Sequence, residues 1–177
     1  MTLVKPIVGI LTSQRHLLGS VLAYMAERFG PADVIGPWRE FNHTRYYEDE
    51  MGPGLWRCFV SFSRLVSAEE ASSFKGLAMD IEGRFSVDGR RAVNIDPGYI
   101  DSCKLVLVSG KHGGHKIALA PGAFADLLLW YDKGWKAMPW AFPDFRDGGY
   151  FPIFIKMRSE FKKQFKNANS PDSSTCC

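Results

Sequence analysis

Short apolar runs that alternate with two amphipathic helices most restrict what this chain can fold into. Residues 6–11 predict a first strand that is buried on both faces. Thr12 or Ser13 is expected to cap the helix that follows, and Gly30-Pro31 ends it, as a glycine at the C-terminal cap followed by proline does. The apolar face of this helix recurs at helical spacing and consists of Leu17, Leu18, Val21, Leu22, Met25 and Phe29.

The same alternation continues to residue 96. Residues 33–41 and 55–62 predict two strands, with an acidic and aromatic loop at 42–54 between them. Ser67-Ala68-Glu69-Glu70 has the form of a capping box and opens a second helix. Its apolar face is Ala71, Phe74, Ala78, Ile81 and Phe85. With a fourth strand at 92–96 the order is βαββαβ, which resembles a ferredoxin-like core by element order.

The second half predicts an antiparallel β-meander followed by a C-terminal helix. Three strands are expected at 103–109, 115–120 and 123–131, with Gly113-Gly114 and Pro121-Gly122 as hairpin signals. The last helix is expected at 150–166, with Ile153, Met157, Phe161 and Phe165 as its inner stripe. We therefore predict a single α+β domain over residues 1–166, with helices packed on a mostly antiparallel sheet, and a disordered tail at 167–177.

Composition restricts the class of protein. The hydrophobic fraction of 46% and charged fraction of 23% are those of a soluble globular protein. The net charge is +3 and the cations are scattered until the last helix, so we predict no nucleic-acid binding. No apolar stretch approaches the ~18 residues of a membrane span. Cys58 and Cys103 lie in apolar runs and predict buried free thiols. No Cys-x-x-Cys occurs, so we predict no zinc site and a cytoplasmic location.

The segment Asn94-Ile95-Asp96-Pro97-Gly98-Tyr99 is the most informative polar stretch. Pro-Gly pairs favour tight turns, because proline fixes φ and glycine accepts positive φ. Polar side chains on such a turn, at strand ends, are well placed to meet a ligand. An ordinary turn has the same composition, so both interpretations stay open.

Nine short segments, in order, resemble one family, the prokaryotic domain of unknown function 4416. They are residues 8–13 (VGILTS), 29–31 (FGP), 46–52 (YYEDEMG), 59–62 (FVSF), 93–99 (VNIDPGY), 104–107 (KLVL), 115–119 (HKIAL), 139–140 (PW) and 143–146 (PDFR). The resemblance spans residues 5–165. It departs from the usual family sequence at Phe145, where tyrosine is usual, and in the Gly-rich segment 111–114.

The resemblance implies no defined activity, although members sometimes carry an automatic GTP-binding label. This chain does not support that label. It has no Gly-x-x-x-x-Gly-Lys-Ser/Thr motif. Residues 109–116 resemble a phosphate loop only in composition, since they join two strands rather than a strand and a helix. We predict no GTPase activity.

Several separated polar residues form a candidate site where the turn at 96–99 would meet the loop at 140–146. We assign catalysis to Asp96 and His115, since a carboxylate and an imidazole suit acid–base work. The predicted ligand-binding residues are Asn94, Tyr99, Lys104, Asp144, Arg146 and Trp140. Alternatively, Asp96 orders its turn, His115 caps a hairpin, and Asp144 pairs with Arg146 on the surface.

Three other groups have a functional and a structural interpretation. Tyr46, Tyr47, Glu48 and Glu50 form a metal site if Asp96 or His115 lies near, or otherwise a solvated acidic loop; we assign no metal ligands. The aromatic residues of 135–150 form a stacking wall or a loop packed over the core. Cys176-Cys177 matches the doubly prenylated tail of some eukaryotic small GTPases. The rest of the chain does not resemble those proteins.

Two functional hypotheses follow. The first is an enzyme or ligand-binding protein that acts on a small anionic metabolite, phosphorylated metabolites included, through Asp96, His115 and Arg146. The second is a non-catalytic interaction module that uses the aromatic loop 135–150 and the basic last helix. The cofactor, the reaction and the oligomeric state do not follow from the sequence. The pocket geometry distinguishes the two, because only the first needs the three side chains around one concavity.

Overall fold

The computed structural model describes residues 2–169, in which ten strands form one large curled antiparallel sheet. Seven strands follow the order β10-β11-β9-β8-β1-β4-β2, and β12, β3 and β5 pair with β11, β4 and β1. β6 (Ser86–Val87) and β7 (Arg90–Arg91) pair separately. The strands of the large sheet are β1 (Leu3–Thr12), β2 (Ala32–Ile35), β3 (Arg39–Glu40), β4 (Trp56–Phe62), β5 (Val66–Ser67), β8 (Asn94–Ile100), β9 (Lys104–Ser109), β10 (Ile117–Ala120), β11 (Ala123–Tyr131) and β12 (Trp135–Ala137).

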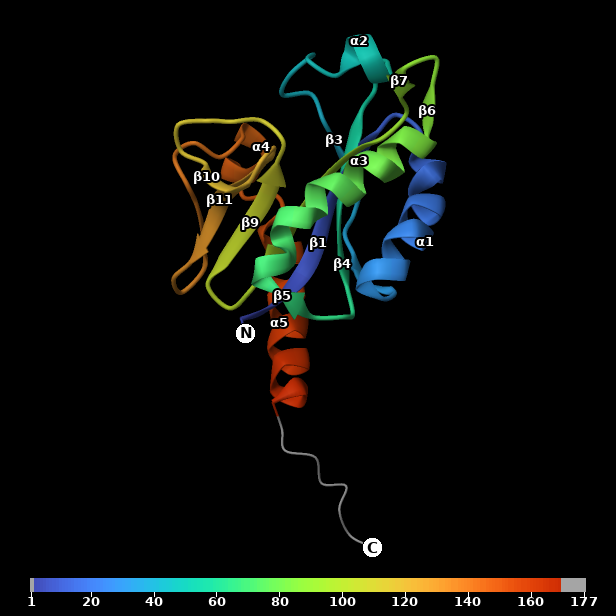
Figure 1. Cartoon of the computed structure of the whole chain (residues 1–177). Coiled ribbons are helices and arrows are strands. Elements are labelled where there is room, and N and C mark those ends of the chain that lie inside the picture. The colour runs from blue at the N-terminus through green and yellow to red at the C-terminus, as the bar shows by residue number, and fades with distance from the viewer. Residues whose placement is uncertain (1, 170–177) are drawn as a thin grey trace, which may run out of the picture.

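Helices cover both faces of this sheet (Figure 1). One core lies between the sheet and α1 and α3, and includes Met25 and Phe74. The other lies under α4 and α5 and includes Phe145 and Phe154. The helices are η1 (Arg15–Leu17), α1 (Leu18–Phe29), α2 (Glu48–Met51), η2 (Ala68–Ser73), α3 (Phe74–Arg84), α4 (Pro143–Arg146) and α5 (Phe151–Ala168). The predicted α+β class is therefore confirmed.

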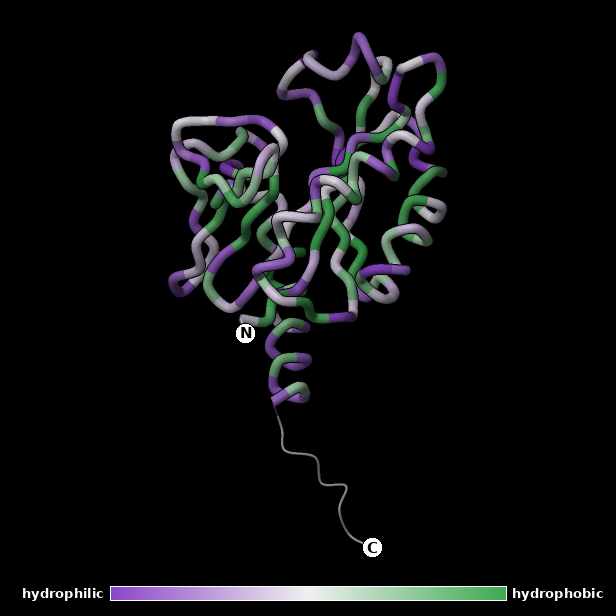
Figure 2. The backbone as a smooth tube through the Cα atoms, in the orientation of Figure 1, coloured by the Kyte–Doolittle hydropathy of each residue, from purple (hydrophilic) through white to green (hydrophobic). Residues whose placement is uncertain are grey.

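Burial on both faces explains why the central strands are almost continuously apolar. Along β1, Val8 and Ile10 face α1 and α3, whereas Ile7 faces α5. Figure 2 shows the same distribution, with hydrophobic residues in the central strands and hydrophilic ones in the loops. No helix of the described residues is long and apolar enough to cross a membrane.

A fully buried lysine joins α5 to the sheet. Lys5 on β1 donates from Nζ to the carbonyl oxygen of Phe62 and to Oε1 of Gln164, each at 2.8 Å, and pairs with Asp33. Burial lowers the pKa of Lys5 from its ordinary value. All three protons of the ammonium therefore have acceptors, as a buried charge requires.

The predicted capping box is present. Ser67 and Glu70 cap each other's backbone at the start of η2, which continues into α3. The cap predicted at Thr12 or Ser13 is wrong, because the N-cap is Gln14 for η1 and Leu17 for α1, and neither has a side-chain cap. The hydroxyl of Thr12 instead accepts a hydrogen bond from the N–H of Gln14 at 2.9 Å, before η1 begins. Gly30 ends α1 with φ +73°, as predicted.

The strand predicted at 33–41 is divided into β2 and β3. Gly36-Pro37 separates them, and proline has no N–H to donate to the ladder. α5 continues to Ala168, past the predicted end at residue 166. The disordered tail predicted for 167–177 lies, from residue 170 on, outside the described residues.

The predicted turn at 96–99 is wrong. Asp96, Pro97, Gly98 and Tyr99 lie within β8, and Pro97 pairs with Val8 of β1. On its other side β8 pairs with β9 only from Gly98 onward, so the missing N–H of Pro97 lies where that ladder stops. Gly98 is required by close packing, since a Cβ there would lie 2.1 Å from the carbonyl oxygen of Val106.

The predicted meander is also wrong in its strand order. β9 and β10 do not form a hairpin across Gly113-Gly114, because β11 lies between them. Only the hairpin at Pro121-Gly122, which joins β10 to β11, is as predicted. The segment between β9 and β10 therefore becomes a long connection, and His115 lies in a turn before β10.

Gly98→Ala should destabilise the fold because its Cβ cannot fit against β9. We expect the free energy of unfolding to fall by about 3 kcal/mol, the upper end for overpacking, as measured by urea denaturation. Gly19→Ala on α1 is the control, since a Cβ there meets nothing within 4 Å. It should change stability by less than about 1 kcal/mol, in the stabilising direction. Equal effects of the two substitutions would contradict the close approach at Gly98.

The two described cysteines should differ in reactivity. Cys58 is a buried free thiol, as predicted, whereas Cys103 is exposed, contrary to the prediction, because it precedes β9 in a turn. Burial raises the pKa of the Cys58 thiol to about 12. Because the thiolate is the nucleophile, iodoacetamide at about pH 8 should label Cys103 and spare Cys58. Peptide mass spectrometry measures this. Unfolding in denaturant should expose both, and equal labelling of the folded protein would refute the assignment.

Candidate functional site

A cavity of about 920 Å³ opens where β8 and β9 stop pairing. Asn94 and Asp96 of β8 line it on one side of the interrupted ladder. Leu107, Val108 and Ser109 of β9 line it on the other. The proline that ends the ladder therefore also positions the cavity. Its volume lies in the range of small-molecule sites, ~300–1,000 Å³.

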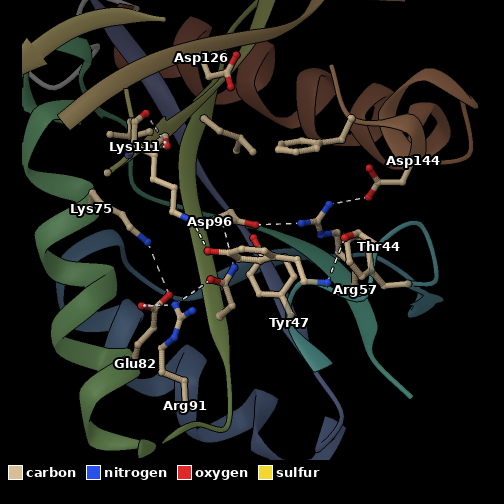
Figure 3. Close-up of a pocket in the computed structure, with 18 of the residues that line it drawn as sticks. Thr44, Tyr47, Arg57, Lys75, Glu82, Arg91, Asp96, Lys111, Asp126 and Asp144 are labelled. Carbon is tan, nitrogen blue, oxygen red and sulfur yellow. Dashed lines mark hydrogen bonds and ion pairs between the residues drawn. The ribbon is translucent and has the colours of Figure 1, made fainter. Parts of the chain in front are cut away.

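Segments from much of the fold complete the walls (Figure 3). They come from the connection between β3 and α2, from β4, α3, β6 and β7, from the segment after β9, from β11 and from α4. The aromatic and apolar members are Phe41, Tyr46, Tyr47, Met79, Phe142 and Phe145. The charged members are Arg57, Lys75, Glu82, Arg91, Asp96, Lys111, Lys116, Asp126 and Asp144.

Arg57 of β4 is the cation that pairs with two of the carboxylates at the bottom of the cavity. Its Nη1 donates to Oδ2 of Asp144 at 2.6 Å, and its Nη2 donates to Oδ2 of Asp96 at 3.1 Å. Burial alone would lower the pKa of Arg57, but the carboxylates of Asp96 and Asp144 outweigh it and raise that pKa. The guanidinium therefore stays charged and holds together β4, β8 and α4.

Arg91 forms a second hub of the same network. It donates to both carboxylate oxygens of Glu50, at 2.6 and 2.8 Å, and to Glu82 and Asn94 at 3.2 and 3.0 Å. Hydrogen bonding to Glu50 raises the pKa of Arg91. Asn94 in turn donates from Nδ2 to Asp96 at 3.0 Å. Hydrogen bonds thus connect Glu50 to Asp144 without a break, across the cavity floor.

Three lysines line the cavity from α3 and from the segment after β9. Lys75 donates to the carbonyl oxygen of Ile95 at 3.3 Å and lies 3.7 Å from Glu82. Lys116 donates to the hydroxyl of Ser109 at 3.0 Å. Lys111 donates to the hydroxyl of Tyr46 at 2.7 Å, across the cavity from its own segment. Its ammonium also lies 4.5 Å from the centre of the Tyr46 ring; within the described residues it forms no ion pair shorter than 4 Å, and its charge adds to the hydrogen bond from Arg91 in lowering the pKa of Glu50.

Three of the predicted site residues line this cavity: Asn94, Asp96 and Asp144. Asp144 is buried and pairs with Arg57, so the surface pair that we considered for Asp144 and Arg146 does not form. The geometric reason is their spacing. Residues two apart on a helix point to different sides, so Arg146 is exposed while Asp144 faces inward.

The other predicted residues lie outside the cavity lining. His115 stacks on Trp140 and lies 3.5 Å from Asp126, which does line the cavity. Trp140 donates to the carbonyl oxygen of Leu127. Tyr99 packs against the core beside α1 and α3, and Lys104 pairs with Asp101 at the turn between β8 and β9.

Sequence reasoning missed the residues that carry most of the charge, above all Arg57, Arg91 and Glu82. One signal was present for Arg57, which interrupts the apolar run that predicted β4. A buried charge is rarely found without a partner, so an arginine there implies carboxylates nearby. Glu82 gave a similar signal on the inner face of α3, where it is 3% exposed.

The two remaining candidate groups have mainly structural roles. Glu50 pairs with Arg91, and no three His, Cys, Asp or Glu side chains within residues 2–169 are grouped as a metal site would require. In the aromatic segment, Trp135, Phe145 and Tyr150 belong to the core under α5. Trp140 and Phe142 remain exposed. Cys176 and Cys177 lie outside the described residues.

The fold and cavity define an α+β protein with a charged, aromatic-lined pocket over an interrupted sheet. The sequence matches the family profile described as "Domain of unknown function (DUF4416)" over residues 2–161, so the chain belongs to that family, as the resemblance predicted. The comparison with curated proteins found no match. The comparison with solved structures likewise found none.

Removing the central guanidinium should strongly destabilise the fold. Arg57→Ala leaves the carboxylate of Asp144 buried without its cation, a change that typically costs about 3–5 kcal/mol. Chemical denaturation measures the loss in the free energy of unfolding.

Arg39→Ala is the matched control, because Arg39 pairs with Asp147 at 3.5 Å on the surface. It should cost less than about 1 kcal/mol. A loss at Arg57 no larger than at Arg39 would show that the buried pair is not needed for stability.

Proposed function

We propose that this protein binds a small anionic metabolite in the cavity between β8 and β9. The observation that carries the proposal is Lys111, whose ammonium lines the cavity, donates to the hydroxyl of Tyr46 at 2.7 Å and lies 4.5 Å from the centre of that ring. Of the five cationic side chains in the lining, Arg57, Arg91, Lys75 and Lys116 each lie within 4 Å of a carboxylate, whereas Lys111 forms no such ion pair within the described residues. An anionic group beside Lys111 and Lys75 would give Lys111 an anionic partner, and two ammonium groups suit a phosphate or carboxylate.

The enzymatic form of this proposal keeps Asp96 and His115 as its acid–base residues. His115 would act from the rim through Asp126, to which it lies closest. Arg57 takes the position that we had assigned to Arg146, beside Asp96. Both carboxylate oxygens of Asp96 already accept hydrogen bonds, one from Arg57 and one from Asn94. These bonds leave Asp96 less free to act as a base, so the structure supports ligand binding more strongly than catalysis.

The alternative of an interaction module is supported by the exposed side chains of the aromatic loop 135–150 and of the basic helix α5. Trp140 is 40% and Phe142 is 54% exposed, and Lys156, Lys162 and Lys163 of α5 are exposed. Such a surface would bind another protein rather than a metabolite. This alternative predicts that no small anion raises the melting temperature, and that Phe142→Ser weakens binding to a partner.

We further propose that β1, α1, β2, β4, α3 and β8 form a ferredoxin-like core. Their chain order βαββαβ and their antiparallel neighbour order β8-β1-β4-β2 support it. The free thiols of Cys58 and Cys103 support a reducing, cytoplasmic location.

Thermal-shift measurements with inorganic phosphate, sugar phosphates, nucleotides and divalent metals test the binding proposal. A ligand at 100 times its Kd stabilises the folded state by about 2.7 kcal/mol, which raises Tm by about 5–10 °C. Lys111→Gln should weaken binding of a positive hit about tenfold, since it removes a charge-assisted hydrogen bond. It should change stability by no more than about 0.5 kcal/mol.

Lys156→Gln provides the control, because it makes the same charge change on the exposed face of α5, away from the cavity. Its ligand affinity should equal that of the wild-type protein. If no anion raises Tm, or if both substitutions weaken binding equally, the cavity is not an anion site.

A further inference from the structure

Two buried carboxylate oxygens in the cavity wall have no hydrogen-bond partner. They are Oδ1 of Asp126 on β11, which lies 3.5 Å from Nε2 of His115 without forming a hydrogen bond, and Oδ1 of Asp144 on α4. The two residues are only 4% and 3% exposed. Buried polar atoms are nearly always satisfied, because an unsatisfied acceptor has lost its water and gained nothing in return. Whatever occupies the cavity is therefore expected to donate hydrogen bonds at these two places.

The two acceptors lie on other sides of the cavity than Lys75 and Lys111. In Figure 3, Asp126 is at the top of the cavity and Asp144 is at the right, whereas Lys75 and Lys111 are at the left. The occupant therefore needs an anionic group at one side and hydrogen-bond donors at the other.

The donors should be neutral, because each carboxylate already has a cation beside it. Asp144 accepts from Arg57 through its other oxygen at 2.6 Å. Asp126 lies 3.7 Å from the ammonium of Lys116. A cationic group on the ligand would lie beside the charges of Arg57 and Lys116, whereas a hydroxyl group donates a hydrogen bond without adding charge.

We propose that the ligand is a hydroxylated organic anion, such as the phosphate ester of a polyol or sugar. Its anionic group binds Lys111 and Lys75, and its hydroxyl groups donate to Oδ1 of Asp126 and of Asp144. This inference rests on the proposed function and adds to it the class of ligand and two specificity-determining carboxylates. Sites built to accept hydrogen bonds from a hydroxyl group reject analogues that lack it, because their buried acceptors are then left unpaired.

A series of phosphate monoesters of equal charge tests this class by calorimetric titration of the whole protein. Propyl phosphate carries no hydroxyl group, whereas glycerol phosphate adds hydroxyl groups to the same skeleton and ribose phosphate adds more. We expect glycerol phosphate or ribose phosphate to bind at least about tenfold more tightly than propyl phosphate, the value of one hydrogen bond to a charged acceptor.

A matched pair of substitutions assigns the difference to Asp126. Asp126→Leu removes the acceptor at similar volume, and because it also removes a negative charge near the bound anion, it should lower the affinity for the hydroxylated ester relative to that for propyl phosphate about tenfold. Asp132→Leu makes the same charge change just beyond β11, where Asp132 pairs with Lys136 outside the cavity lining. It should change neither affinity. If Asp126→Leu fails to fold, Asp144→Asn and the ester series on the wild-type protein decide the question.

The outcomes separate the ligand class from the proposed function. If propyl phosphate binds as tightly as the hydroxylated esters, and Lys111→Gln weakens both, the cavity is an anion site but this ligand class is wrong. If no ester binds to the wild-type protein, both proposals fail. If free glycerol binds as tightly as glycerol phosphate, the anionic group has no role and the assignment to a hydroxylated anion is overturned.

Discussion

The contact of Arg57 with Asp96 and Asp144 is the interaction on which the arrangement of the cavity depends. It joins the middle of the sheet to α4, across 87 residues of chain between Arg57 and Asp144. Without a cation, Asp144 would be a buried charge with no partner, and α4 could not lie where it closes the cavity. The same guanidinium donates to Oδ2 of Asp96, and Oδ1 of Asp96 accepts a hydrogen bond from Asn94. Asn94 in turn accepts a hydrogen bond from Arg91, so the network reaches that residue.

An interruption in the sheet provides the space above this network. In most sheets a proline lies at an edge, because it cannot complete a ladder on both sides. Pro97 lies in an inner strand, and its neighbour β9 begins to pair only at Gly98. The two residues have complementary effects, since Gly98 lets the backbones approach closely and Pro97 ends that approach. The boundary between tight packing and open cavity is therefore encoded in two adjacent residues.

Local patterns predicted α1 and the start of η2 well, the inner face of α5 only in part, since Phe165 is exposed and Phe154 is buried, and the sheet only in part. The face of α1 and the capping box at Ser67 depend on residues within a few positions of each other, so periodicity was sufficient. The position of β11 between β9 and β10 depends on pairing between distant strands, which a hairpin signal cannot reveal. In the site, Asp96 and Asp144 were predicted from their polar side chains beside the expected turn and loop. Their partner is Arg57 rather than the predicted Arg146, and this pairing depends on which side of α4 faces the sheet, which the sequence does not show.

The hydrogen bond from Lys111 to the hydroxyl of Tyr46 joins two walls that are 65 residues apart in sequence. Because an ammonium carries three protons, Lys111 can keep this bond and still donate to a further acceptor. The contact therefore fixes the segment after β9 against the loop before α2, and it holds the ammonium at the surface of the cavity that both segments line.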